Sequence, residues 1–157
     1  MKLSEGNRVT IQALKNLGSP RNQIWMNRFK AMVMRSSLIM TAGTFVFTHA
    51  AIHPSWWTEV KDHRNMEHYS LFGEFDLTPK SDQPRRTYNW IDSIPEGTTV
   101  IVGHDARSTI APVTKTGELG GQAIFLDTGS GKGGSLSSVD IRFTDEGKMK
   151  MENFTKH

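Results

Sequence analysis

The sequence predicts an α+β protein in which helices flank a mixed β-sheet. Helical periodicity is clear in the first 36 residues, and short β-branched runs follow one another at hairpin spacing in much of the remainder. That succession of strands favours a mixed sheet over a doubly wound parallel one. A chain of 157 residues suits one domain with a sizeable core. We therefore expect a single domain, 1–157, with a basic helical segment at 1–36 and a sheet-forming part at 37–157.

Two helices are predicted in the basic segment. The first covers Val9–Leu17 and is closed by Gly18-Ser19-Pro20; the second covers 21–34, with Asn22 as its N-cap. Apolar residues at i, i+4 and i+8 form a stripe on the second helix, and we expect this stripe to pack on a core. Seven basic side chains against Glu5 alone give residues 1–36 a net charge of +6. Such a segment either binds nucleic acid or is a solvated helix face.

Strands are predicted on both sides of a less readable middle region. Residues 37–41 and 44–48 flank Ala42-Gly43 and are typical of a β-hairpin. Prolines and scattered aromatic residues in 50–97 indicate loops and short helices that cover the sheet. Further strands are expected at 98–102, 122–126, 135–143 and, after a turn at 145–147, at 148–154.

Composition excludes several classes of protein. Charged residues at 22% and aromatic residues at 9% are those of an ordinary soluble globular protein. Cysteine is absent, which excludes disulfides, thiolate catalysis and cysteine zinc sites. No apolar run reaches membrane-spanning length, and residues 1–12 lack the apolar core of a signal peptide. We expect a cytoplasmic protein without a membrane partner.

Two apolar runs each deliver a histidine at their end. Residues 45–51 end in His49-Ala50-Ala51, and residues 99–106 lead to Gly103-His104. If the two strands lie side by side, both imidazoles come within reach of a single metal ion. We expect Gly103 to let the backbone turn sharply before His104. The alternative is that each histidine is a hydrogen-bonded surface residue at a strand end.

Three further patterns have competing interpretations. Asp127-Thr128-Gly129-Ser130 matches the aspartic-protease signature, but the glycine-rich stretch that follows does not suit a packed strand. The loop 129–135 lacks the spacing of a phosphate-binding loop, so we expect a strand-to-strand connection. Arg85 and Arg86 could clamp phosphate oxygens with their planar guanidinium groups, or be a surface pair.

Together these motifs resemble a known enzyme family. The runs 45–50, 100–104 and 125–129, with Gly133-Gly134-Ser135-Leu136, look like the C-terminal half of a calcineurin-like metallophosphoesterase. The resemblance covers residues 37–143 and is greatest to the bacterial and phage phosphoprotein-phosphatase and diadenosine-tetraphosphatase type, including the phosphatase domain of bacterial polynucleotide kinase-phosphatase. It implies that 37–157 is the second half of a metallophosphoesterase β-sandwich, with a dinuclear metal site at its edge.

The resemblance also implies roles for individual residues. His49 and His104 would be ligands of the same metal ion. Asp127 would support the site without being a ligand, as would Gly103. Arg85 or Arg86 would bind the substrate phosphate. The implied cofactors are two divalent ions, with manganese favoured over iron, zinc or nickel, and the implied substrate is a phosphoprotein, a nucleic-acid end or a dinucleotide polyphosphate.

The sequence departs from this family in one respect. The family's other ligands come from an N-terminal half that carries Asp-x-His, Gly-Asp-x-x-Asp-Arg-Gly and Gly-Asn-His-Glu motifs, which this chain lacks. Residues 1–9 resemble the stretch that follows the last of these motifs. We expect a truncated or split phosphatase that holds one metal in part and requires an N-terminal half polypeptide. The alternative is a non-catalytic module that binds a partner or nucleic acid through residues 1–36.

Overall fold

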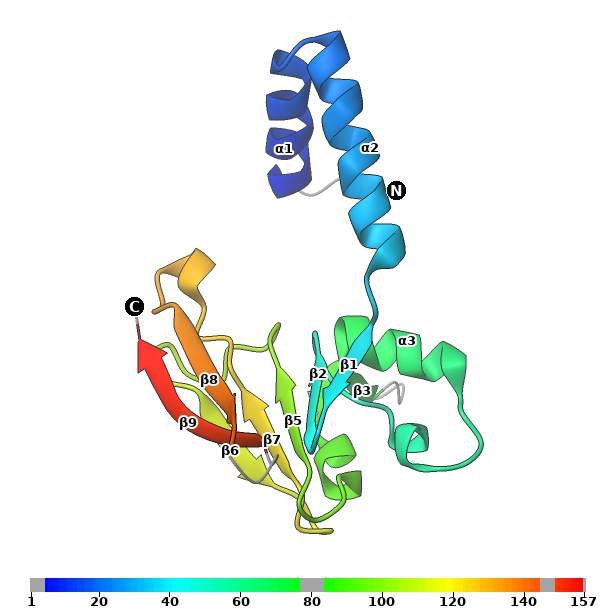
Figure 1. The fold of residues 1–157 in the computed structure, drawn as a ribbon, viewed down its shortest axis with the longest axis vertical. Helices are drawn as coiled ribbons and strands as arrows, with labels where there is room; N and C mark the ends of the chain where they lie inside the picture. The colour runs from blue at the N-terminus through cyan, green and yellow to red at the C-terminus, as the bar shows by residue number, and fades with distance from the viewer. Residues whose placement is uncertain (1–4, 77–83, 145–148, 157) are drawn as a thin grey trace. The chain divides into compact units, whose positions relative to one another are not determined.

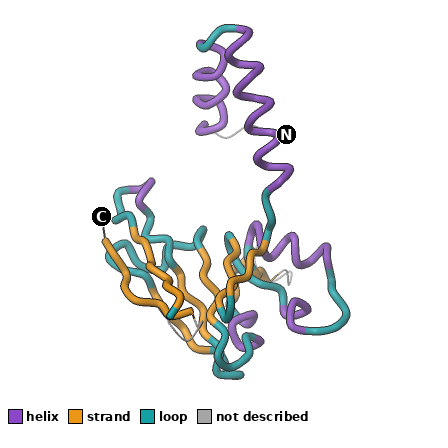
Figure 2. Tube along the Cα trace, in the orientation of Figure 1, coloured by secondary structure: helices purple, strands orange, loops and turns teal. Residues whose placement is uncertain are grey.

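The protein has an α+β fold, described here by a computed structural model for residues 5–76, 84–144 and 149–156 (Figures 1 and 2). These residues contain three α-helices, a five-stranded mixed sheet and two two-stranded hairpins. The chain divides into two compact units, Met1–Ser37 and Leu38–His157. The basic segment that we expected within a single domain thus forms a compact unit of its own, and the sheet lies in the second unit.

The first unit is a helical hairpin of α1 (Glu5–Asn16) and α2 (Ser19–Arg35). Both helices lie where the sequence predicts them, but α1 begins four residues earlier than expected. The N-cap of α2 is Gly18 rather than Asn22, because Gly18 with φ +77° makes the turn between the helices and Pro20 occupies the first helical turn. Neither of these helices, nor the other described helix, could span a membrane.

The apolar stripe of α2 is not a core. No side chain of α2 is buried, and the apolar residues of the predicted stripe are between 51% and 59% exposed: Ile24, Trp25, Phe29, Met32 and Val33. Our prediction that this stripe packs on a core is therefore wrong for this unit. The physical reason is that α1 covers little of α2: among residues 8–35, whose burial is described, only Leu14, Asn22 and Met26 are half-buried.

The five-stranded sheet of the second unit has the strand order β1-β2-β5-β7-β6. Its strands are β1 (Ile39–Ala42), β2 (Phe45–Thr48), β5 (Thr99–Val102), β6 (Val113–Thr116) and β7 (Gln122–Phe125). Strands β2, β5 and β7 are parallel, and β1 and β6 pair with them antiparallel at the two edges. The predicted hairpin at 37–48, the strands at 98–102 and 122–126 and the mixed sheet are confirmed.

Side chains alternate between two apolar faces of this sheet, as period-two strands require. One face carries Val46, Val100 and Phe125 and packs against Trp90 and Ile52. The covering elements on that face are the short helices η1 (Pro54–Trp57) and η2 (Asn89–Ser93), whose tryptophans and isoleucine join the cluster. This confirms that 50–97 supplies loops and short helices over the sheet.

The opposite face carries Phe45, Ile101 and Ile124, and it packs against Val139 and Ile141. Those two residues belong to β8 (Ser137–Phe143), which pairs antiparallel with β9 (Met149–Lys156). Figure 1 shows this hairpin on the β6–β7 side of the sheet. The predicted strands at 135–143 and 148–154 are thus confirmed with small shifts, whereas the turn expected at 145–147 lies outside the described residues.

Helix α3 (His63–Phe72) and the strand pair β3 (Glu74–Asp76) and β4 (Arg85–Thr87) lie between β2 and β5, and the sequence did not predict them individually. Helix α3 begins at Asp62, whose carboxylate accepts a hydrogen bond from the Asn65 backbone N–H at 3.1 Å. This bond is the main reason why the pKa of Asp62 is lowered. Strands β3 and β4 then form an antiparallel pair, which positions Arg85 and Arg86.

Candidate metal centre

Both candidate histidines lie at the carboxyl ends of adjacent parallel strands. The last pair in the β2–β5 ladder is Thr48 with Val102. His49 comes one residue after β2, and the Gly103 backbone N–H continues the ladder by donating to the His49 carbonyl at 2.9 Å. His104 follows Gly103. The parallel pairing therefore brings to one sheet edge two side chains that are 55 residues apart in the sequence.

The two imidazoles face each other through one nitrogen each. His49 Nε2 and His104 Nδ1 are 2.9 Å apart, and the ring planes meet at 70°. Two nitrogens that each lie about 2.1 Å from an ion, at right angles to one another, are about 3.0 Å apart. The observed separation therefore fits a shared metal ion as well as an imidazole–imidazole hydrogen bond. Both side chains are exposed, so an ion can reach them.

The backbone at His104 adopts a conformation that ordinary residues avoid. His104 has φ +63° and is the one residue other than glycine with a positive φ in the described parts of the chain. Such conformations cost free energy and cluster at functional sites. Gly103 has no positive φ, and a Cβ there would meet only the His49 carbonyl oxygen at 3.6 Å, an ordinary contact. The sharp turn that we expected at Gly103 is thus made by His104 itself.

Neighbouring charges act on His104 in both directions. Burial, His49 and Arg86 lower the pKa of its imidazole, whereas the carboxylates of Asp105 and Asp127 raise it. The net effect is a pKa below the usual value of 6.5. A lowered pKa keeps the ring neutral, which is the form that binds a metal ion.

Asp127 is held in a compact loop directly after β7. Its Oδ1 accepts a hydrogen bond from the Gly129 backbone N–H at 2.7 Å. Thr128, only 2% exposed, donates its hydroxyl to the Ser135 carbonyl and lies 2.9 Å from the Ser137 hydroxyl. The loop runs from β7 to β8, which agrees with the expected strand-to-strand connection.

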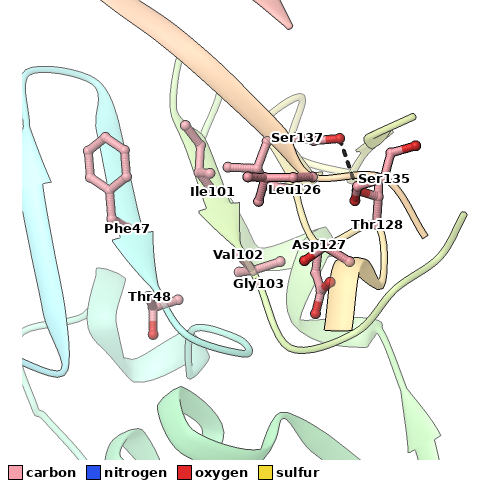
Figure 3. A pocket seen from close by; sticks show the side chains of 12 residues that line it. Phe47, Thr48, Ile101, Val102, Gly103, Leu126, Asp127, Thr128, Ser135 and Ser137 are labelled. Carbon is pink, nitrogen blue, oxygen red and sulfur yellow. Dashed lines mark hydrogen bonds between the residues drawn. The ribbon is translucent and has the colours of Figure 1, made fainter. Parts of the chain in front are cut away.

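A pocket of about 340 Å³ adjoins this loop and the two strand ends (Figure 3). Phe47 and Thr48 line it from β2, and the β5 end, including Gly103, lines the middle. Asp127 lies on the loop side of the pocket (Figure 3). Since Thr48 precedes His49 and Gly103 precedes His104, the pocket begins beside the histidine pair.

The structure separates the two candidate arginines. Arg86 is half-buried, with its guanidinium carbon 4.7 Å from the centre of the Phe75 ring. Its charge acts to lower the pKa values of both His104 and Tyr88. Arg85 is exposed, and the two arginines line a second pocket of about 460 Å³. Of the two, Arg86 is thus the one whose charge acts on His104.

Sequence reasoning missed a cluster around Tyr88. The Tyr88 hydroxyl donates to Asp105 Oδ2 at 2.6 Å and accepts from the Arg107 guanidinium. Arg107 and Lys115 place their charges 4.5 and 4.9 Å from the centre of the Tyr88 ring. Asp105 and Arg107 could have been suspected from the sequence, because they follow the candidate ligand His104 by one and three residues. Lys115 gave no such signal, because it lies on β6, which we did not predict.

The described residues do not complete a metal site around the histidine pair. Within residues 5–76, 84–144 and 149–156, no group of three histidine, aspartate or glutamate side chains is arranged to hold an ion. The pair thus offers two nitrogens of a coordination sphere that needs at least four ligands for most transition metals. Comparison with models of known protein families and with curated proteins finds no match for this chain.

Proposed function

We propose that this chain carries part of a dinuclear, metal-dependent phosphoesterase site that hydrolyses phosphomonoesters. The observation that carries the proposal is the 2.9 Å approach of His49 Nε2 and His104 Nδ1 at the ends of two parallel strands. Manganese is the favoured ion, and imidazole also suits iron, zinc and nickel. In such a site, divalent ions activate water and neutralise charge on the phosphoryl oxygens.

The remaining ligands would come from another polypeptide segment. Two imidazoles alone bind a divalent ion weakly, and the described residues supply no bridging carboxylate. We therefore expect this chain to be nearly inactive by itself. The segment that completes the site would add the carboxylates for both ions, as the N-terminal half does in the metallophosphoesterases that the sequence resembles.

An uncovered part of the sheet offers a place for that segment. Strand β1 is an edge of the sheet. Met40 on this strand is 59% exposed, and Leu38, the residue just before the strand, is 45% exposed. Met40 pairs with Phe47, which lines the pocket beside the histidines. An added chain that covers this face would bury apolar surface and reach the metal centre.

The substrate phosphate would bind beside Arg86. The planar guanidinium can donate two hydrogen bonds to one phosphate, and its electrostatic effect on His104 supports a place for that phosphate on the same side of the sheet as the proposed ion. Asp127 would keep a supporting role, because its carboxylate already accepts the Gly129 N–H. The substrate classes remain a phosphoprotein, a nucleic-acid end or a dinucleotide polyphosphate, and the proposed location is the cytoplasm.

The test measures metal-dependent binding of inorganic phosphate by the full chain. Bound Mn²⁺ broadens the phosphorus resonance of a phosphate that lies beside it, so broadening reports both ligands at once. We expect broadening with the natural chain, its loss in His49→Ala and its reduction in Arg86→Gln. His63→Ala, which removes an exposed histidine at the start of α3, serves as the matched control and should change nothing.

Hydrolysis of para-nitrophenyl phosphate with Mn²⁺ is measured in the same samples. Turnover that is at most marginal would agree with an incomplete site. Full turnover that is lost in His49→Ala would contradict the need for a second segment, because the ligand set would then be complete in this chain. Phosphate broadening that survives His49→Ala would contradict the metal centre itself.

The basic helical hairpin of α1 and α2 favours a second candidate function, the binding of nucleic acid or a protein partner without catalysis. Arg21, Arg28 and Arg35 are spaced by seven residues on α2 and therefore share one side of the helix, near the exposed Trp25. Salt-sensitive binding of DNA or RNA that needs no metal and is lost when these arginines become glutamine would support this function. Binding unchanged by those substitutions would contradict it.

A further inference from the structure

The pocket of about 460 Å³ beside β4 and β6 concentrates positive charge. Arg85, Arg86 and Lys115 line it, and none of the three forms an ion pair with a carboxylate of the described residues. Two carboxylates, Asp76 and Asp92, also line it. The Asp92 Oδ1 accepts the Glu118 backbone N–H at 3.2 Å, so part of its charge is engaged. The lining thus holds three cations against two carboxylates.

Tyr88 also lines the pocket and holds two cations beside its ring, of which only Lys115 lines the pocket as well. The Lys115 ammonium lies 4.9 Å from the ring centre, and Arg107 places its guanidinium 4.5 Å from the same point. The pKa of Tyr88 is raised by burial and by the hydrogen bond to Asp105, so the ring stays neutral at ordinary pH. Arg107 is engaged by the Tyr88 hydroxyl and by Asp105 Oδ2 at 3.7 Å, whereas cation–π attraction holds the Lys115 ammonium beside the ring and leaves its N–H donors available to an anion.

This pocket is connected to the histidine pair through named contacts. Asp105 directly follows His104 and accepts the Tyr88 hydroxyl at 2.6 Å. Arg86 lines the pocket and also acts electrostatically on His104. The contact between Tyr88 and Asp105 therefore joins the pocket to the residue that follows His104, so a ligand with one phosphate at the histidine pair can extend toward the pocket.

We propose that this pocket beside Tyr88 is a second anion subsite, in which Lys115 and Arg85 bind a further phosphate of the substrate. The inference rests on the proposed function, since it assigns that site a substrate with at least two phosphates. A singly phosphorylated side chain would leave these cations unused. The two phosphates belong to an oligophosphate chain, joined by anhydride bonds, or to a nucleic-acid end, joined through a nucleotide.

The experiment measures the binding of anions by calorimetry with all metal ions chelated. The probes are inorganic phosphate, tripolyphosphate and a 5′-phosphorylated thymidine dinucleotide. Since a hydrogen bond to a charged group contributes about 1.5–3 kcal/mol, we expect Lys115→Gln to weaken the better of the two multiphosphate probes about tenfold or more. Lys115→Arg should restore most of the affinity, which a misfolded variant could not do.

The matched control is Lys61→Gln. Lys61 is an exposed lysine whose ammonium lies 5.5 Å from the centre of the Trp56 ring, and it does not line the pocket. This substitution should leave anion affinity unchanged. His49→Ala should also leave metal-free anion binding intact while it abolishes Mn²⁺ binding, so a failure of the metal centre and a failure of the subsite give different results.

Either multiphosphate probe can support the inference. Tighter binding of tripolyphosphate would assign an anhydride-linked chain, and tighter binding of the dinucleotide would assign a nucleic-acid end. Inorganic phosphate that binds as tightly as both would overturn the subsite, because no second phosphate would then be recognised. Equal losses in Lys115→Gln and Lys61→Gln would overturn it as well, since the effect would come from net charge alone.

Discussion

The hydroxyl of Thr128 fastens the loop that carries Asp127, and its removal provides a quantitative test of the fold at the site. Thr128→Val keeps the shape of the side chain but deletes the hydroxyl. Thr128 is 2% exposed, and its hydroxyl donates to the Ser135 carbonyl and contacts the Ser137 hydroxyl. The substitution therefore leaves the Ser135 carbonyl without this donor in a largely buried loop.

The magnitude follows from these contacts. A hydrogen bond of this kind contributes about 1 kcal/mol net, and a buried acceptor left without a donor costs somewhat more. The Ser137 hydroxyl is half-buried and can turn toward water, which limits the second loss. We expect Thr128→Val to lower the free energy of unfolding by about 1–2 kcal/mol. Thr128→Ser keeps both contacts and removes one buried methyl group, for a loss of about 1 kcal/mol.

The assay is urea unfolding followed by tryptophan fluorescence, because three of the four tryptophans lie in the Leu38–His157 unit. A double-mutant cycle with Ser137→Ala isolates the contact between the two hydroxyls. The losses of unfolding free energy in the two single variants should sum to more than the loss in the double variant. A Thr128→Val protein as stable as the natural chain would refute the reasoning. So would strict additivity, since it would mean that the Thr128–Ser137 contact contributes nothing.

Three further outcomes are expected. Gly134→Ala should lower the urea midpoint, because its Cβ would lie 1.8 Å from the Thr128 carbonyl oxygen, whereas Gly131→Ala, with nothing within 4 Å, should not; equal midpoints would contradict this. Burial and Glu74 raise the pKa of Tyr69 from 10.0 to about 12, so the tyrosine's contribution to stability is present below pH 10 and is lost as the pH rises toward 12. Tyr69→Phe should flatten that alkaline fall in Tm, and an unchanged fall would count against it. The lowered pKa of His104 means that the unfolded chain binds more protons just below pH 6.5, so stability drops as the pH falls through that value; a Tm profile from pH 7.5 to pH 5 should be flatter in His104→Gln, and parallel profiles would argue against the shift.

The strands that position the site were predictable because they are buried on both faces. Val46 and Phe45 point to opposite apolar clusters, as do Val100 and Ile101, so both strands appear in the sequence as continuous runs of β-branched and aromatic residues. A histidine at the end of such a run is easy to see. Which histidine lies next to it in the sheet is not visible in the sequence, since the parallel pairing of β2 with β5 depends on tertiary packing.

Other parts carried no readable pattern. Strand β6 is the short edge run Val-Thr-Lys-Thr, half exposed, and its pairing with β7 rather than its own sequence makes it a strand. Hence Lys115, which lies on it, could not be placed beside Tyr88 in advance. Helix α2 gave the opposite error. Its apolar stripe was visible, but periodicity alone does not say whether anything covers such a stripe.

The most direct test of the central claim is where Mn²⁺ binds among the six histidines of the chain. Imidazole resonances of the full protein are followed while substoichiometric Mn²⁺ is added, in the natural chain and in His49→Ala. The account predicts that the resonances of His49 and His104 broaden first and together, and that the His49→Ala substitution removes the broadening of His104. Equal broadening of all histidines, or selective broadening of His104 that persists without His49, would contradict a shared metal ion.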